Sequence, residues 1–298
     1  GSEMCIRDSF LGRAGIEATI FERESCLGGV PRHVIPAFRI ANETIEKDIA
    51  LMEKYGVDVR CGAPAPSVKE LKAMGYTHIL FAVGAWKPGK LDIPGDVAGA
   101  IQWMKGVKAG NIAVGGSIAV VGGGNVAMDA ARSALRLGAE TVYIVYRRGM
   151  AELPARKEEV EHAEEEGIIF KTLCNPVEIL PDEDGFVKAI TCIEMELGEP
   201  DASGRRRPIE KKGSEFTMDV DTVIMSLGTS PNPLIRSTTP GLETNKHGCI
   251  VTEGDEGKTS REGVYAGGDA VTGAATVIKA MGAGKAAAKA IDEYIQNK

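Results

Sequence analysis

Apolar and polar positions follow two alternating periods along most of the chain, which predicts strands and helices in turn. Residues 17–24 alternate apolar and polar side chains and end in acids, as a half-buried strand does. An apolar stripe at helical spacing follows within 45–55, and apolar strands are predicted at 57–60 and 78–85. Alternating strands and helices are typical of an α/β fold with a parallel sheet.

The pattern starts afresh after the glycine-rich stretch 106–117, as at a domain boundary. A strand, a glycine turn, a helix and a second strand are predicted within 117–148, and further strands follow. Near residue 240 the composition returns to the first type and ends in a strand, a glycine turn and an Ala-rich helix. We therefore predict one nucleotide-binding domain, residues 111–236, inserted into a discontinuous domain of residues 10–110 and 237–298.

The first nine residues, GSEMCIRDS, show no periodicity and meet the helical pattern after them abruptly. They resemble a cloning scar followed by translated adapter sequence, so we interpret residues 1–9 as a foreign leader and exclude them from fold reasoning. A first strand with its own glycine turn is expected ahead of Phe10 in a domain of this kind. The outer domain is therefore expected to lack both.

Composition narrows the class of protein. With 298 residues and 43% hydrophobic side chains, two domains can each bury a core, and a net charge of −7 excludes a broad basic surface for nucleic acid or an anionic membrane. The six cysteines are scattered without a C-x-x-C pair, and the four histidines lack metal-binding or triad spacing. No apolar run approaches the roughly 20 residues of a membrane span. We expect a cytoplasmic protein with no metal site.

The sequence GGGNVA at 122–127 follows an apolar strand and opens a helix. In this G-x-G-x-x-A pattern, Gly122 permits the tight turn, Gly124 lets a pyrophosphate approach the backbone, and Ala127 lets the helix pack close to the sheet. Asn125 and Val126 would supply N–H groups at the helix N-terminus, where phosphate is favoured. The pattern indicates a Rossmann-like dinucleotide-binding domain. The alternative is a turn without a ligand.

The next strand ends in Arg147 and Arg148, where NADH-binding domains carry an acid. Guanidinium groups form bidentate bonds with phosphate, so the pair favours the 2′-phosphate of NADPH. The alternative is a solvated basic strand end. Arg156 could join the pair or could belong to a surface helix.

The outer domain carries weaker signals of the same kind. Glu22 ends its second strand, where an acid typically binds an adenosine ribose, and the turn Gly28-Gly29 follows. Near the C-terminus, Gly268-Asp269 lies between a strand and the helix after Thr276, a layout that suits a flavin. The alternative for Asp269 is an ordinary helix cap.

Several motifs resemble those of the NADPH-dependent flavoproteins grouped with the small subunit of glutamate synthase. They are LGGVPRHVIPAFRI, VVGGGNVAMDAAR, VYRRGMAELPARKEEV, LGEPDASGRRRP and VYAGGDAVTGAATVIKAMGAGKAA. Within that group they look most like the flavoprotein domain of a subunit assigned to selenate reductase. The resemblance implies FAD in the outer domain, NADPH in the inserted domain and electrons leaving to iron–sulfur centres.

Carried onto this sequence, the resemblance places cofactor-binding positions in both domains. The FAD-side positions are Glu22, Gly28, Gly29, Arg39, Ala82, Gly84, Gly268, Asp269 and Thr276. The NADPH-side positions are Gly122, Gly124, Asn125, Arg147, Arg148 and Gly228.

The expected activity is hydride transfer from NADPH to FAD, which requires orientation of the two cofactors and no catalytic side chain. The expected partner is an iron–sulfur subunit or domain that accepts the electrons. The alternative is a non-catalytic nucleotide-binding fragment or scaffold that has lost FAD binding.

Overall fold

The structure is a computed structural model that describes residues 11–12, 14–95, 98–202 and 204–297. The predicted leader, residues 1–9, and Phe10 lie outside the described residues. The chain divides into an outer unit, residues 1–87 with 229–298, and an inserted unit, residues 88–228.

The boundaries of these units differ from those of the predicted domains, which lie at 110/111 and 236/237. The chain joins the inserted unit earlier because β5 (Ala98–Gly99) pairs in parallel with β12 (Thr222–Met225). It also leaves earlier, so that β13 (Thr229–Ser230) already belongs to the outer unit. A two-residue strand is too short to leave a pattern in the sequence, which explains the difference.

The inserted unit is built on a five-stranded sheet in the order β5-β12-β6-β7-β8. Its other strands are β6 (Ser117–Val121), β7 (Thr141–Tyr146) and β8 (Ile169–Thr172), and all the pairs are parallel. Both faces of such a sheet must be covered, which is why β6 is apolar along its whole buried length.

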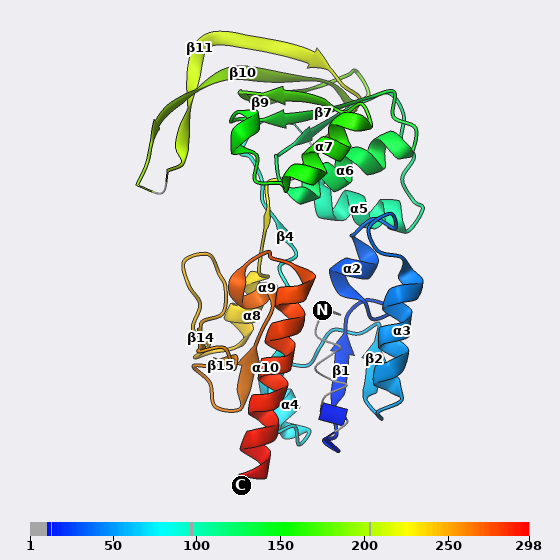
Figure 1. Ribbon diagram of the computed structural model, residues 1–298, viewed down its shortest axis with the longest axis vertical. Helices are drawn as coiled ribbons and strands as arrows, with labels where there is room; N and C mark the ends of the chain where they lie inside the picture. The colour runs from blue at the N-terminus through cyan, green and yellow to red at the C-terminus, as the bar shows by residue number, and fades with distance from the viewer. Residues whose placement is uncertain (1–10, 13, 96–97, 203, 298) are drawn as a thin grey trace. The chain divides into compact units, whose positions relative to one another are not determined.

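Three helices lie together beside this sheet (Figure 1). They are α5 (Ala100–Lys108), α6 (Asn125–Arg136) and α7 (Lys157–Glu165), with a 3₁₀ turn, η2 (Met150–Glu152), before the last. Helix α6 packs closely because the side chains on its inner face are small. Ala127, Ala130, Ala131 and Ala134 are all fully buried.

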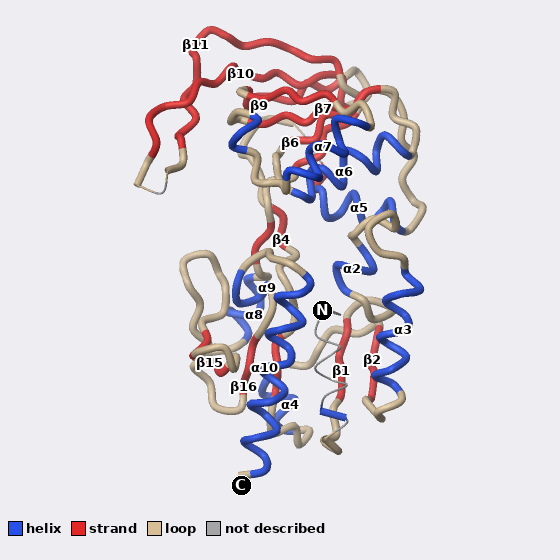
Figure 2. Tube along the Cα trace, in the orientation of Figure 1, coloured by secondary structure: helices blue, strands red, loops and turns tan. Residues whose placement is uncertain are grey.

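An antiparallel sheet, which we call the arm, covers the opposite face. It consists of β9 (Cys174–Pro181), β10 (Val187–Pro200) and β11 (Arg206–Asp219), in the order β11-β10-β9. Ala119 and Val121 of β6 share a buried cluster with Ile190 and Cys192 of β10. Figure 2 shows β10 and β11 as the longest strands, joined at their far end by a turn.

Two sheets lie wholly within the described part of the outer unit. Strand β1 (Thr19–Glu22) pairs in parallel with β2 (Asp58–Cys61). The second sheet has the order β14-β15-β16-β3 and consists of β14 (Thr252–Glu253), β15 (Lys258–Thr259), β16 (Val264–Ala266) and β3 (Ile79–Phe81). Short strand β4 (Lys87–Pro88) pairs with β13.

Helices of the outer unit cover these sheets and join them. They are α2 (Gly29–His33), α3 (Asn42–Glu53), α4 (Val68–Ala73), α8 (Pro233–Thr238), α9 (Asp269–Thr272) and α10 (Val277–Gln296). Helix α4 and the segment after it touch both sheets, since Phe21 of β1 and Ile79 of β3 share one buried cluster. The Tyr76 hydroxyl also donates to Thr19 Oγ1 at 3.0 Å.

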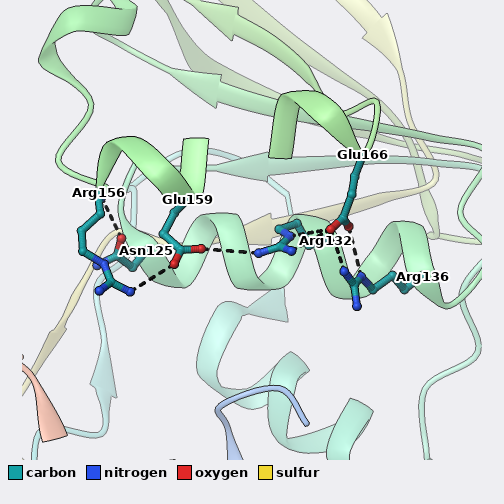
Figure 3. A network of polar contacts seen from close by, with 6 residues as sticks. All are labelled: Asn125, Arg132, Arg136, Arg156, Glu159 and Glu166. Atoms are coloured by element: carbon teal, nitrogen blue, oxygen red, sulfur yellow. Dashed lines mark hydrogen bonds and ion pairs between the residues drawn. The ribbon is translucent and has the colours of Figure 1, made fainter. Parts of the chain in front are cut away.

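Buried ion pairs fasten α7 to α6 in the inserted unit (Figure 3). The Arg132 guanidinium is buried and lies 2.7 Å from Glu166 Oε1 and 3.4 Å from Glu159 Oε2. Arg136 donates to both oxygens of Glu166, at 3.1 and 2.7 Å. The hydrogen bonds from Arg136, and then those from Arg132, outweigh burial and lower the pKa of Glu166 to about 2.

We expect Glu166→Gln to lower the free energy of unfolding by about 2 kcal/mol near neutral pH. Because the folded-state pKa is depressed, this contribution is complete above an unfolded pKa of 4.5 and is lost as the pH falls toward about 2. Urea unfolding of both proteins from about pH 7 to about pH 3 measures it. The matched control is Glu161→Gln on the same helix, whose exposed pair with Lys157 should contribute under about 0.5 kcal/mol. A loss that does not change with pH would contradict the prediction.

Candidate functional site

The turn after β6 requires glycine because the backbone of β12 approaches it closely. Gly122 has φ 140°, and a Cβ built there would lie 2.2 Å from the carbonyl oxygen of Ser226. The Gly122 N–H donates to Val145 O of β7 at 2.9 Å, and the Ser226 N–H donates to Val121 O at 2.8 Å. The carboxyl ends of β12, β6 and β7 therefore meet at this glycine turn.

The two glycines that follow differ in the space around them. A Cβ at Gly123 would lie 2.6 Å from the Leu153 side chain and 2.9 Å from that of Tyr146. A Cβ at Gly124 would meet no atom within 4 Å, although the φ of −90° there suits any residue. No contact within the protein therefore requires a glycine at position 124.

Gly124 is the N-cap of α6, and no side chain caps this helix. The N-terminus of a twelve-residue helix presents unpaired N–H groups and a partial positive charge. An open glycine at such an end is the geometry that accepts a pyrophosphate, with Asn125 and exposed Val126 in the first turn. The residues present therefore fit a dinucleotide.

The loop between β7 and α7 folds against this turn. The Ala155 N–H donates to Gly123 O at 3.0 Å, and the Arg156 N–H donates to Asn125 Oδ1 at 3.0 Å (Figure 3). Because the Asn125 amide oxygen is engaged, the amide plane is fixed and its NH₂ group is left to donate to a ligand. The Arg156 side chain is mostly exposed and reaches Glu159 Oε1 at 3.1 Å.

The predicted phosphate-reading arginines follow β7 at the same edge of the sheet. Arg147 is exposed, whereas Arg148 is half-buried and its Nε donates to the carbonyl oxygen of Arg206 at 2.9 Å. Gly228 follows β12, with φ 86° and open space where a Cβ would stand. The structure therefore brings the NADPH-side residues to the carboxyl edge of one sheet.

The first group of FAD-side residues lies with the β1–β2 sheet. Glu22 ends β1 and its Oε1 accepts from the Glu24 N–H at 2.9 Å. Gly28 has φ 134° and is the N-cap of α2, where a Cβ would lie 2.3 Å from Arg32 Cβ. Gly29 begins α2 with φ 48°. Arg39 is half-buried, with its guanidinium 5.6 Å from the centre of the Phe38 ring.

The second group lies at the ends of β3 and β16. The Gly267 N–H donates to Phe81 O at 3.1 Å, which places the turn at Gly268 beside the turn of Ala82 to Gly84. Gly84 and Gly268 have φ of 65° and 67°. These turns are adjacent because their strands are parallel and in register.

Asp269 holds the loop that leads into α10. Its Oδ1 accepts from the Ala275 N–H at 3.1 Å, and the Thr276 hydroxyl caps α10 by accepting from the Lys279 N–H at 3.3 Å. The N-terminus of this 20-residue helix therefore starts close to the Gly268 turn. A helix of this length provides the dipole expected next to a flavin.

Sequence reasoning missed three residues that shape the inserted unit's site. Glu159 is buried between Arg132 and Arg156, Arg206 contacts Arg148 through its carbonyl, and Leu173 alone among described non-glycine residues has a positive φ, 53°. The acidic run around Glu159 reads as a solvated helix face, so no local signal marks it. Arg206 lies in the run of three arginines, which marks a turn but not a role.

The described part of the chain holds neither a disulfide nor a cluster of metal-binding side chains. All five cysteines in it are free thiols. Its histidines, cysteines and acids form no group of three or more that could hold a metal ion. None of the described helices has the length and apolar character to cross a membrane.

Comparisons with known proteins support the same architecture. The chain is similar over its whole length to FprA of Mycobacterium tuberculosis in complex with NADPH, with a TM-score of 0.80 and 18% identity over 83% of that chain. It is similar over 99% of its length to the thioredoxin reductase of T. acidophilum, with a TM-score of 0.75 and 18% identity over 96% of that chain. At this identity the likeness shows the fold, and it confirms the predicted α/β class.

Curated relatives are more similar in sequence. The NADP(+)-dependent formate dehydrogenase subunit beta of Moorella thermoacetica is 37% identical over 96% of this chain and 41% of its own length. The NADPH-Fe(3+) oxidoreductase subunit beta of Geobacter sulfurreducens is 34% identical over 96% of this chain and 48% of its own length. A chain assigned as the small chain of NADPH glutamate synthase in Cereibacter sphaeroides is 33% identical over 96% of this chain and 73% of its own length.

This chain spans less than half of the first two relatives, and together the relatives confirm the flavoprotein group predicted from the motifs. The family model described as pyridine nucleotide-disulphide oxidoreductase matches residues 9–284. The chain therefore belongs to the pyridine nucleotide-disulphide oxidoreductase family.

Proposed function

We propose that this chain is an NADPH-dependent FAD oxidoreductase that passes electrons to an iron–sulfur partner subunit or domain in the cytoplasm. The observation that carries the proposal is the open position at Gly124, at the uncapped N-terminus of α6, next to the strand end that bears Arg147 and Arg148. This combination suits a dinucleotide with a 2′-phosphate. Family membership supports an oxidoreductase.

When both cofactors are bound, NADPH supplies a hydride and FAD accepts it, so the residues of this chain bind and orient. We assign the pyrophosphate of NADPH to the N–H groups at the start of α6 and its 2′-phosphate to Arg147 and Arg148. We propose that Glu22 and Asp269 bind hydroxyl groups of FAD. The N-terminus of α10, capped by Thr276, would face the flavin ring.

The partner is proposed from the relatives. Two of them are named as beta subunits, one of a formate dehydrogenase and one of an NADPH-Fe(3+) oxidoreductase, so those proteins work in assemblies. The sequence has no C-x-x-C dithiol that could take electrons from the flavin. Electrons therefore leave by another route, and an iron–sulfur centre suits the one-electron steps of a flavin.

A non-catalytic nucleotide-binding module is the second candidate. It is favoured by the division of the FAD-side residues between two sheets of the outer unit. Flavin separates the two functions: an oxidoreductase yields a yellow protein that NADPH bleaches without oxygen, and a module does not.

Gly124→Ala tests the nucleotide site directly. The variant should melt like the unmutated protein, because a Cβ at Gly124 meets open space and φ is ordinary. Its affinity for NADPH should fall by at least about tenfold, since the methyl group occupies the path of the pyrophosphate. Fluorescence titration with NADPH measures the change. Gly115→Ala is the matched control, because a Cβ there also meets open space. Unchanged binding by Gly124→Ala would remove the pyrophosphate from this position.

Arg147→Ala tests the choice of cofactor. Loss of a charged phosphate contact should weaken the binding of NADPH by about 1.5–3 kcal/mol and leave the binding of NADH nearly unchanged. Titrating both nucleotides against both proteins gives the comparison, with NADH as the internal control. Equal affinity of the unmutated protein for NADPH and NADH would remove the basis of the assignment.

The acceptor preference is tested with two dyes. Loaded with FAD, the protein should use NADPH to reduce ferricyanide but should not turn over dithiobis-nitrobenzoate. The two half-buried thiols that come closest to forming a pair are Cys26 and Cys61. Burial, followed by the charge of Glu22, raises the pKa of Cys61, which makes it a poor nucleophile. Steady, NADPH-dependent thiol release would contradict the prediction, and its loss in Cys26→Ser/Cys61→Ser would identify the source.

A further inference from the structure

The far end of the arm is a closed hairpin. Between β10 and β11 the Gly204 N–H donates to Asp201 O at 2.8 Å, and the Arg205 N–H donates to the Asp201 side chain at 3.1 Å. The hairpin continues into a run of three arginines, of which the side chains are exposed. This run is the part of the sequence motif that the proposed function leaves without a role.

A β-bulge interrupts the ladder just before this turn. Leu197 pairs with Pro208 and Pro200 pairs with Arg206, so β10 advances three residues while β11 advances two. A bulge leaves backbone groups of the longer strand without their ladder partners. The Arg206 side chain bonds two carbonyls at this bulge: its Nε donates to Gly198 O at 3.1 Å and its Nη2 donates to Leu197 O at 3.3 Å.

One guanidinium therefore fastens the two strands across the bulge. The backbone carbonyl oxygen of the same residue accepts from Arg148 Nε at 2.9 Å. The position of that carbonyl depends on how firmly Arg206 holds the bulge. Its neighbour Arg207 has an exposed side chain and the same charge, but the contacts at the bulge are made by Arg206.

The end of β7 is tied to the arm through its main chain as well. The Leu173 N–H donates to Arg148 O at 2.9 Å, and the Met195 N–H of β10 donates to Leu173 O at 2.7 Å. Leu173 has φ 53°, a left-handed conformation that is costly for leucine and that this pair of bonds maintains. Hydrogen bonds thus connect Arg148 to the arm twice: through Leu173 for its backbone, and directly to Arg206 for its side chain.

This arrangement preorganises Arg148. Of its five N–H donors, the one on Nε is engaged, so the orientation of the guanidinium plane is fixed and the Nη donors are left for a ligand. A side chain that is already ordered loses less rotamer entropy when it binds phosphate. Arg147 is exposed, so the two arginines are not equivalent.

We propose that Arg206 is a positioning residue for nucleotide recognition: by fastening the bulge of the arm, it fixes the carbonyl that aims Arg148 at the 2′-phosphate of NADPH. The proposal rests on the proposed function and adds to it a specificity device outside the glycine turn. It differs from a purely electrostatic role of the arginine run, in which each of the three charges would count alike.

Three variants separate the two roles. Arg206→Ala removes charge and contacts, Arg206→Lys keeps the charge but cannot reach both carbonyls with a planar fork, and Arg207→Ala removes the same charge without touching the bulge. We expect the two Arg206 variants to lose roughly fivefold to tenfold in NADPH affinity and Arg207→Ala to change by less than about twofold. Binding of NADH should stay unchanged in all three, which also shows that the inserted unit is folded.

A wild-type affinity of Arg206→Lys, with equal losses in Arg206→Ala and Arg207→Ala, would overturn the proposal in favour of charge alone. The double variant Arg148→Ala/Arg206→Ala should bind NADPH as Arg148→Ala does, because Arg206 acts through Arg148. Additive losses would also overturn it.

These outcomes are distinct from failure of the proposed function. If the unmutated protein binds NADPH and NADH alike, the proposed function fails. If Arg148→Ala abolishes the preference while both Arg206 variants keep it, only the role of Arg206 fails.

Discussion

The approach of the chain to Ser226 O at Gly122 is the constraint on which the inserted unit depends. A Cβ cannot fit there, so the turn must be glycine, and its N–H reaches Val145 O across the sheet. That contact sets where β6 stops and where α6 begins relative to β7 and β12. The helix N-terminus, the strand end with Arg147 and the Gly228 turn then share one edge, as open α/β sheets require of a binding site.

The buried charge of Arg132 imposes a second condition on the same site. A guanidinium removed from water needs ionic partners within the protein. Glu159 in α7 and Glu166 just after that helix supply them. Helix α7 must therefore lie along α6. Its N-cap residue, Arg156, then meets Asn125 in the first turn of α6, so the ion pairs of Arg132 help to fix the amide beside the glycine turn.

Sequence reasoning reached the features that are local in the chain and missed those that depend on pairing. The motif at 122–127 is local in the chain, and its spacing predicts the tight turn at Gly122 and the close packing of α6 at Ala127, which the structure shows. The role of Arg206 follows from a one-residue bulge between strands, which no pattern in either strand announces. The glycine-rich stretch 106–117 predicts a boundary at 110/111, whereas the inserted unit begins at Pro88 and includes β5, whose two residues are recognisable only beside β12. The expectation of a missing first strand concerns residues ahead of the described chain and stays a prediction.

The two groups of predicted FAD-side residues lie on different sheets of the outer unit, and the packing between those sheets sets how far apart the groups are. Glu22 ends β1, and Asp269 follows β16, which pairs with β3. The ring of Phe21, next to Glu22, packs edge-on against Tyr76 at 5.9 Å between centroids, and Phe21 shares a cluster with Ile79 of β3. Tyr76 also bonds Thr19, the first residue of β1. Side chains of α4 and the segment after it thus set the separation of the two strand ends. Any ligand that spans Glu22 and Asp269 depends on this packing, even though neither Phe21 nor Tyr76 belongs to a nucleotide motif.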